Sequence, residues 1–133
     1  MNRKIINMKD TLVAVFMALL TVGAAQAVDY TWNGAASGAW NTPANWSPNG
    51  LPGAGDTVYF PSAVEITDGF TIGAGTLTIT NGTGTVSLRG NITGLGRMEK
   101  YGVGALSLYG NNTFSGGFYV QGARKRSDRK SVV

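Results

Sequence analysis

Short alternating strands separated by glycines are the feature of this sequence that most limits its fold. Seven stretches place two apolar residues around one outward residue, often Thr or Ser: 58–60, 64–66, 70–72, 77–79, 86–88, 106–108 and 118–120. Alternation with period two puts the apolar side chains on one face of a strand. Glycine-rich turns such as Gly73-Ala-Gly75 lie between the strands and can adopt positive φ without a Cβ clash. The mature chain shows no helical periodicity, so the sequence predicts an all-β fold.

Repetition favours a solenoid over a β-sandwich. The segments 75–82, 84–90 and 104–110 are weak copies of one another. Both architectures accommodate many short strands, but only a solenoid stacks each strand on its counterpart one coil later. We therefore expect a right-handed parallel β-helix whose coils bury a thin column of Val, Ile and Leu.

Residues 1–27 have the order of a secretory signal peptide, which is expected to be helical. A positive stretch, 1–10, precedes an apolar run, 12–22, and then small residues. Ala25 and Ala27 predict cleavage after Ala27. An uncleaved membrane anchor is the alternative, but the apolar run is shorter than the ~20 residues needed to span a bilayer. We expect export through the inner membrane, to the outer membrane and cell surface or into the medium.

Charge and composition exclude several classes of function. The net charge of +4 comes from the two ends of the chain, because the residues between 28 and 123 carry three basic and five acidic side chains, about −2 in sum. That stretch has no basic patch for nucleic acid. The absence of Cys and His removes disulfides, thiolate zinc sites and the commonest acid/base side chain. We expect no cofactor and no metal.

Four carboxylates are the candidates for hydrolase or lyase chemistry, which needs two placed together. They are Asp56, Glu65, Asp68 and Glu99. Asp56 and Asp68 lie in turn contexts that favour backbone capping, and Glu65 is the outward residue of an alternating strand. We interpret these positions as structural and expect no catalytic residue and no enzyme activity.

Residues 94–122 resemble the autotransporter-associated β-strand repeat. The resemblance includes an Asn-Thr-Phe where the family has Asn-Thr-Tyr, and it implies a β-helical segment of a type V secretion passenger that assists folding and transport at the outer membrane. The matching residues are Lys100, Gly102, Gly104, Leu106, Leu108, Gly110, Asn112, Thr113, Phe114, Gly116, Gly117, Val120 and Gly122.

Residues 28–60 are expected to form an N-terminal cap and the first strand, and 61–122 the β-helix coils. The opening is similar to the cap-like start of many such proteins. Its three tryptophans, Trp32, Trp40 and Trp46, either close the apolar end of the first coil or form a sugar-stacking platform. We favour the cap and keep carbohydrate contact as the alternative.

Residues 123–133 break the repeat with a basic stretch. We expect a non-native or disordered tail on a truncated chain, because the last six residues resemble a translated sequencing adapter. A genuine basic tail that binds an acidic partner is the alternative.

These observations predict an exported structural or adhesive surface segment without catalysis of its own. Two alternatives remain open: the non-catalytic start of a secreted polysaccharide-degrading β-helix enzyme, and a carbohydrate-binding module that uses the tryptophans. The expected partners are the export machinery, an outer-membrane β-barrel encoded downstream, and a surface polysaccharide or a ligand on a host or neighbouring cell, but no nucleic acid.

Overall fold

The computed structural model describes residues 25–121. Most of the predicted signal peptide, Gly122 and the basic tail lie outside these residues. Within the described part, no helix is long and apolar enough to cross a membrane.

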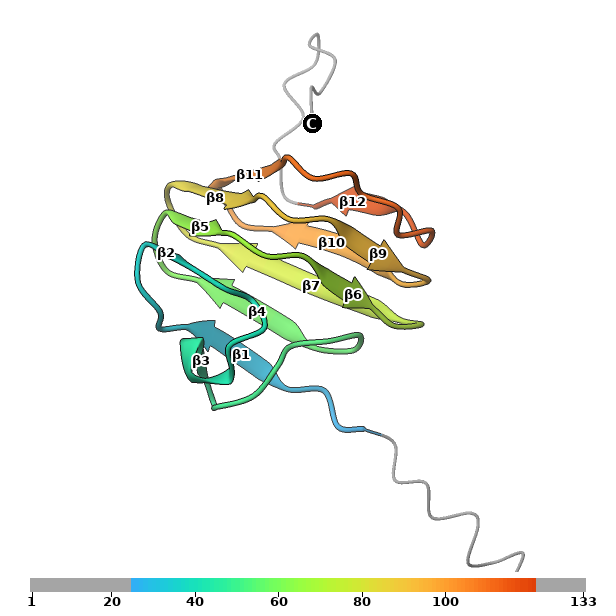
Figure 1. The fold of residues 1–133 in the computed structure, drawn as a ribbon, viewed down its shortest axis with the longest axis horizontal. Coiled ribbons are helices and arrows are strands. Elements are labelled where there is room, and N and C mark those ends of the chain that lie inside the picture. Colours follow the sequence, from blue (N-terminus) through green and yellow to red (C-terminus); the bar gives the residue numbers. More distant parts are fainter. Residues whose placement is uncertain (1–24, 122–133) are drawn as a thin grey trace, which may run out of the picture.

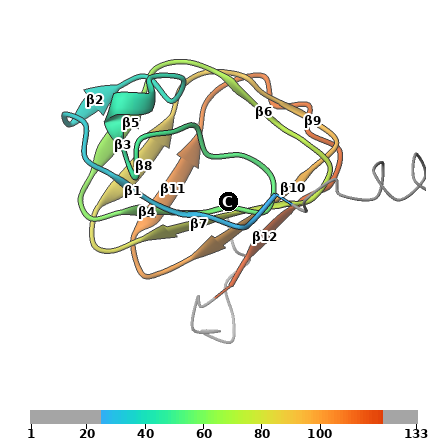
Figure 2. The same ribbon diagram turned by 90° about the horizontal axis from the view of Figure 1, so that it is seen from below.

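The described chain is a β-solenoid with three faces (Figure 1). Viewed from its N-terminal end (Figure 2), the chain turns clockwise while it moves away from the viewer, so the coil is right-handed as predicted. One short 3-10 helix, η1 (Pro43–Asn45), lies in the opening segment. The strands are β1 (Asp29–Trp32), β2 (Ser37–Gly38), β3 (Trp46–Ser47), β4 (Thr57–Phe60), β5 (Val64–Ile66), β6 (Phe70–Ile72), β7 (Thr76–Asn81), β8 (Thr85–Leu88), β9 (Ile92–Gly94), β10 (Arg97–Tyr101), β11 (Ala105–Leu108) and β12 (Phe118–Val120).

Each face is a sheet of stacked strands. Face A has the order β12-β10-β7-β4-β1-β3, face B the order β11-β8-β5-β2, and face C pairs β6 with β9. Neighbouring strands are parallel except for β3, which runs antiparallel to β1. The antiparallel strand covers the outer edge of β1 at the N-terminal end of the stack, where a free edge would otherwise be open to pairing.

The register fixes the length of a coil. On face A, Val58 pairs with Ile79 and Ile79 with Lys100, which is 21 positions each time. On face B, Val86 pairs with Leu106, 20 positions later. The predicted likeness of 84–90 and 104–110 is therefore a true coil repeat. The segment 75–82 lies on face A, so its likeness to the other two reflects shared strand and turn chemistry and not stacking.

All seven predicted strands are present, and a single buried cluster fills the coil interior. Strands β1, β2 and β3, within the stretch predicted as the cap, and strands β9 and β10 were not predicted. The fully buried side chains come from all three faces and from the opening segment: Trp40, Trp46, Val58, Phe60, Ile66, Ile72, Leu77, Ile79, Val86, Leu88, Ile92 and Met98.

Candidate functional site

The three tryptophans of the opening segment point into the molecule. Trp32, Trp40 and Trp46 are only 3%, 1% and 1% exposed. Trp46 makes edge contacts with the other two, at centroid distances of 5.0 Å to Trp32 and 4.8 Å to Trp40. Each indole N–H donates to a backbone carbonyl, for example from Trp46 to Trp40 O at 2.8 Å. The burial leaves no ring face open for a sugar, which supports a cap and speaks against a stacking platform built from these residues.

Two of the four candidate carboxylates bind cap backbone. Asp56 accepts from Val28 N at 2.9 Å and from Gly53 N at 2.8 Å. Asp68 accepts from Trp40 N, and from Asn41 N at 3.0 Å. Both carboxylates thus connect the opening segment to the second coil, in agreement with the capping interpretation.

The other two candidate carboxylates lie on different faces and form ion pairs. Glu65 on face B pairs with Arg89 at 2.8 Å, and Glu99 on face A pairs with Arg97 at 3.4 Å. No metal-binding group of three acidic side chains occurs within residues 25–121. Each of the four candidate carboxylates is thus engaged by backbone amides or by an arginine.

Lys100, the first residue of the repeat-like motif, has an unexpected place inside the coil. It continues the column of Val58 and Ile79 and is 5% exposed. Its Nζ donates to Tyr101 O at 2.9 Å and to Gly102 O at 2.8 Å. Burial lowers the pKa of Lys100 below its usual value of 10.5. The ammonium group therefore stabilises the turn between β10 and β11 by hydrogen bonds from the inside of the coil.

Asn81 stabilises the same corner from the coil below. Its Nδ2 donates to Ala105 O at 3.0 Å, and the residue is 1% exposed. Gly102 follows it in the stack at φ +88°, and a Cβ at Gly104 would collide with the Asn81 amide and with Gly84 O. The spacing of Lys100, Gly102 and Gly104 is therefore explained by one buried polar corner, which also contains Asn81.

The motif residues from Leu106 to Phe114 complete the coil that begins with β10, and Gly116, Gly117 and Val120 lead into β12, which stacks on β10. Asn112 Oδ1 accepts from Ile92 N at 2.9 Å, and Thr113 N donates to Ile92 O at 2.8 Å, so this segment runs along β9. Gly110 and Gly116 lie too close to the backbone of the coil below to carry a Cβ. Leu106, Leu108 and Phe114 pack against the core, Gly117 has φ +89°, and Val120 pairs with Lys100.

Three of the four exposed tyrosines in the described chain lie on the outer surface of face A instead of at the cap. Tyr59, Tyr101 and Tyr119 are 41%, 38% and 47% exposed. Thr80 lies between Tyr59 and Tyr101 in the same outward column, so those two tyrosines are two strand spacings apart, about 9.6 Å. We call these three residues the tyrosine face.

Polar contacts order the C-terminal part of the tyrosine face. The Arg97 guanidinium lies 5.0 Å from the ring centre of Tyr119. The Tyr101 hydroxyl donates to Glu99 Oε2 at 3.1 Å, and this hydrogen bond raises the pKa of Tyr101. Arg97 and Glu99 offset each other's charge, and the outward column between Tyr59 and Tyr101 contains only the uncharged Thr80. The alternating pattern already places Tyr59 and Tyr119 outward, but sequence reasoning missed the alignment of Tyr59 with Tyr101, because that alignment depends on the coil register.

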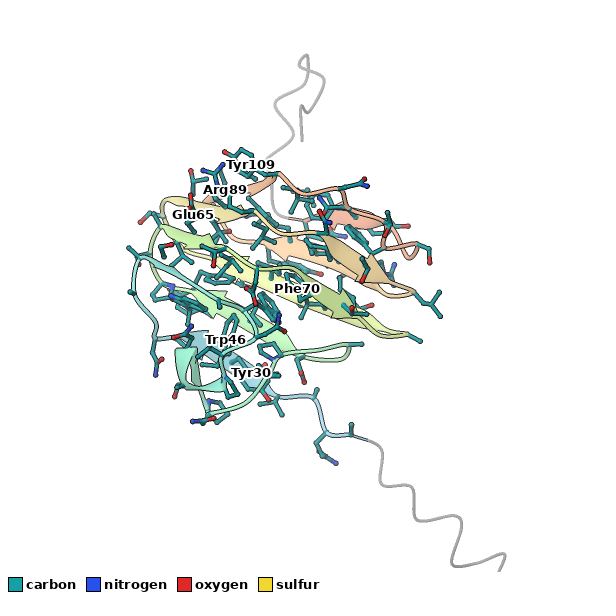
Figure 3. The ribbon with its side chains drawn as sticks, viewed as in Figure 1. Tyr30, Trp46, Glu65, Phe70, Arg89 and Tyr109 are labelled. Carbon is teal, nitrogen blue, oxygen red and sulfur yellow. The ribbon has the colours of Figure 1, made fainter. Side chains whose placement is uncertain are left out.

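A second outward stack occupies the end of face B. Figure 3 shows Glu65, Arg89 and Tyr109 above one another along one side of the solenoid. Arg89 Nε donates to Glu65 Oε2 at 2.9 Å, and the guanidinium carbon lies 4.0 Å from the ring centre of Tyr109. Arg89 thus makes an ion pair with Glu65 on one side and a cation–π contact with Tyr109 on the other.

Comparison with known proteins gives one informative similarity. Over 102 residues the chain is 29% identical to the "Adhesin BmaC autotransporter" of Brucella suis biovar 1 (strain 1330), and the match covers 75% of this chain. The chain spans only 3% of the length of that adhesin. No family model matches the chain, so the assignment of 94–122 to a particular repeat family stays a prediction. No solved structure matches it either.

Proposed function

We propose that this chain is the capped opening of an exported, adhesive autotransporter passenger, and that it contacts its ligand through the tyrosine face. The similarity to an autotransporter adhesin carries the proposal. A right-handed β-solenoid with a buried aromatic cap supports it, because such a stack can present binding residues in fixed register along one face.

The localisation that we propose is supported by the same similarity. Export through the inner membrane, cleavage after Ala27 and display at the outer membrane by a downstream β-barrel are part of the proposal. The inward side chains Leu106 and Leu108 are only partly buried, whereas their counterparts Val86 and Leu88 are buried. Further coils stacked on the C-terminal side would complete that burial, which fits a segment of a longer passenger.

The enzyme alternative has less support. Asp56 and Asp68 are engaged with backbone amides, and Glu65 and Glu99 are ion-paired on separate faces. We therefore propose that the segment has no catalytic activity of its own.

A carbohydrate is a specific candidate for the ligand, although it would be bound by the tyrosine face and not by the buried tryptophans. Exposed aromatic rings pack against pyranose rings, and the two-strand interval between Tyr59 and Tyr101 gives an extended glycan repeated stacking positions. The near-neutral surface between them suits an uncharged polysaccharide.

The proposal is tested by coating beads with the full chain and measuring their binding to cultured cells and to polysaccharide arrays. A triple variant, Tyr59→Ala, Tyr101→Ala and Tyr119→Ala, is expected to lose at least tenfold in binding. Tyr109→Ala serves as the matched control, because Tyr109 is an exposed tyrosine that directly follows β11, away from face A. Equal binding by the triple variant and the control would remove the tyrosine face from the proposal. Absence of binding by the unaltered chain would contradict an adhesive role for this segment.

A further inference from the structure

A carboxylate of the second coil holds the first residue of the solenoid. Val28 N lies 2.9 Å from Asp56 Oδ1, and Val28 O accepts from Thr57 N at 3.0 Å. The second oxygen of Asp56 accepts from Gly53 N at 2.8 Å. The carboxylate is thus fixed on one side by its own loop while its other oxygen faces Val28.

The attachment point coincides with the predicted cleavage site. Ala25, Gln26 and Ala27 are exposed, and Val28 is partly buried. The residues a signal peptidase would need to reach are therefore free of the core, and the first residue after them is already placed against Asp56.

We propose that Asp56 is a binding site for the α-ammonium group that signal cleavage creates at Val28. This inference depends on the proposed export and cleavage. Hydrolysis of the Ala27–Val28 bond consumes one water molecule. Its oxygen goes to the Ala27 carbonyl carbon, which leaves as a carboxylate on the signal peptide, and its two hydrogens end on the Val28 nitrogen as part of –NH₃⁺.

Cleavage changes the strength of this contact without requiring movement. Before cleavage, Val28 offers one neutral amide N–H to Asp56; afterwards the same nitrogen carries a full positive charge and three N–H groups. Hydrogen bonds between two charged groups are shorter and stronger than neutral ones. The contact is partly buried, which limits its screening by solvent. Cleavage therefore strengthens the contact between Val28, which precedes β1, and Asp56, which precedes β4. The first coil becomes more stable only after the signal peptide has been removed.

The experiment compares the exported chain beginning at Val28 with a form that begins at Ala25, produced from a signal peptide cleaved three residues earlier. Each is made with Asp56 and with Asp56→Asn. Asp68→Asn is the matched control, since Asp68 also binds cap backbone but contacts Trp40 and Asn41 instead of Val28. Intact mass measurement identifies the N-terminus of every sample.

The unfolding equilibrium constant of the Val28 form is expected to be about two- to fivefold smaller than that of the Ala25 form. This difference should vanish in Asp56→Asn and persist in Asp68→Asn. A difference that survives Asp56→Asn, or no difference in the unaltered pair, overturns the inference.

A second readout does not depend on the folding of the Asp56 variant. Acetic anhydride should modify the α-amine of the unaltered Val28 form at least twofold more slowly than that of the Ala25 form, and equal rates overturn the inference. If mass measurement shows that the unaltered chain is not processed, the export proposal itself fails; cleavage of the unaltered chain at another site refutes only the predicted cleavage after Ala27 and, with it, the present inference. Correct cleavage without coupling to Asp56 removes the present inference alone.

Discussion

The indole of Trp40 lies flat on the phenyl ring of Phe70, with ring centroids 3.8 Å apart and planes 11° from parallel. Phe70 begins β6 and pairs in register with Ile92 on β9. The cap therefore continues the interior column of face C by one aromatic ring. This stacking explains how an opening segment with little regular structure is held on a regular coil.

Removing this ring should unfold the cap. Trp40→Ala is expected to lower the free energy of unfolding by about 3–5 kcal/mol, since it leaves a cavity against Phe70 and Trp46. Urea denaturation followed by circular dichroism measures the loss. Val103→Ala is the control, because Val103 is 85% exposed and the change should stay within about 0.5 kcal/mol. A loss below 1 kcal/mol for Trp40→Ala would show that the cap does not stabilise the stack.

The buried polar corner predicts which glycines tolerate a methyl group. Gly104→Ala should destabilise the protein by about 1–3 kcal/mol, because the new Cβ meets the Asn81 amide and the Gly84 carbonyl. Gly53→Ala should be nearly neutral, since the same Cβ there meets no atom within 4 Å. The two variants are compared by their urea midpoints. Similar midpoints for both would contradict the described corner.

Lys100 should give stability a pH dependence on the alkaline side. Burial lowers its pKa in the folded state below 10.5, so the unfolded chain binds more protons between the two values and stability rises with pH in that window. The gain is complete above pH 10.5 and is lost as the pH falls through the lowered pKa.

The measurement is the urea midpoint of the unaltered chain relative to Lys100→Met from pH 7 to 10.5. As the pH rises towards 10.5, the urea midpoint of the chain with Lys100 should increase relative to that of Lys100→Met. Both are made in the Tyr101→Phe background, since the raised pKa of Tyr101 acts in the opposite direction above pH 10. Parallel profiles would rule out a buried ammonium at this position.

The ion pair of face B should contribute little to stability. Arg89 and Glu65 are 45% and 42% exposed at their side chains, so Glu65→Gln is expected to cost under about 1 kcal/mol. The cost should fall further in concentrated salt, because salt screens exposed charges. Thermal melts at two salt concentrations check this, and a large, salt-independent loss would point to a contact beyond the pair.

Sequence periodicity was sufficient to predict the strands that have apolar residues at both inward positions. It failed at β10, where Lys100 takes an inward position and makes the segment look like a polar turn. It also failed at β9, whose last residue is Gly94. Neither strand can be identified from its own composition, because it forms by pairing in register with a strand of the coil below, β7 for β10 and β6 for β9.

The candidate site was only partly predictable for a related reason. The sequence located an aromatic cluster at 32–46, but its burial depends on packing against Phe60 and Phe70. Tyr59 and Tyr101 are 42 positions apart in the sequence. They lie in one outward column only because each coil on face A has 21 residues, and this coil length was not known from the sequence.

Stacking of successive coils in this register is the central structural claim, and engineered disulfides test it most directly. Thr71 and Thr93 are paired on β6 and β9, with their Oγ1 atoms 2.9 Å apart, and the chain has no cysteine of its own. Neighbouring strands lie about 4.8 Å apart, within the Cα separation of about 4.4–6.8 Å that a disulfide spans. Thr71→Cys with Thr93→Cys should therefore form an intramolecular disulfide in the folded full chain, whereas Thr71→Cys with Thr80→Cys, which joins different faces, should not. Failure of the first pair to oxidise, or equal oxidation of both pairs, would contradict the stacked coil.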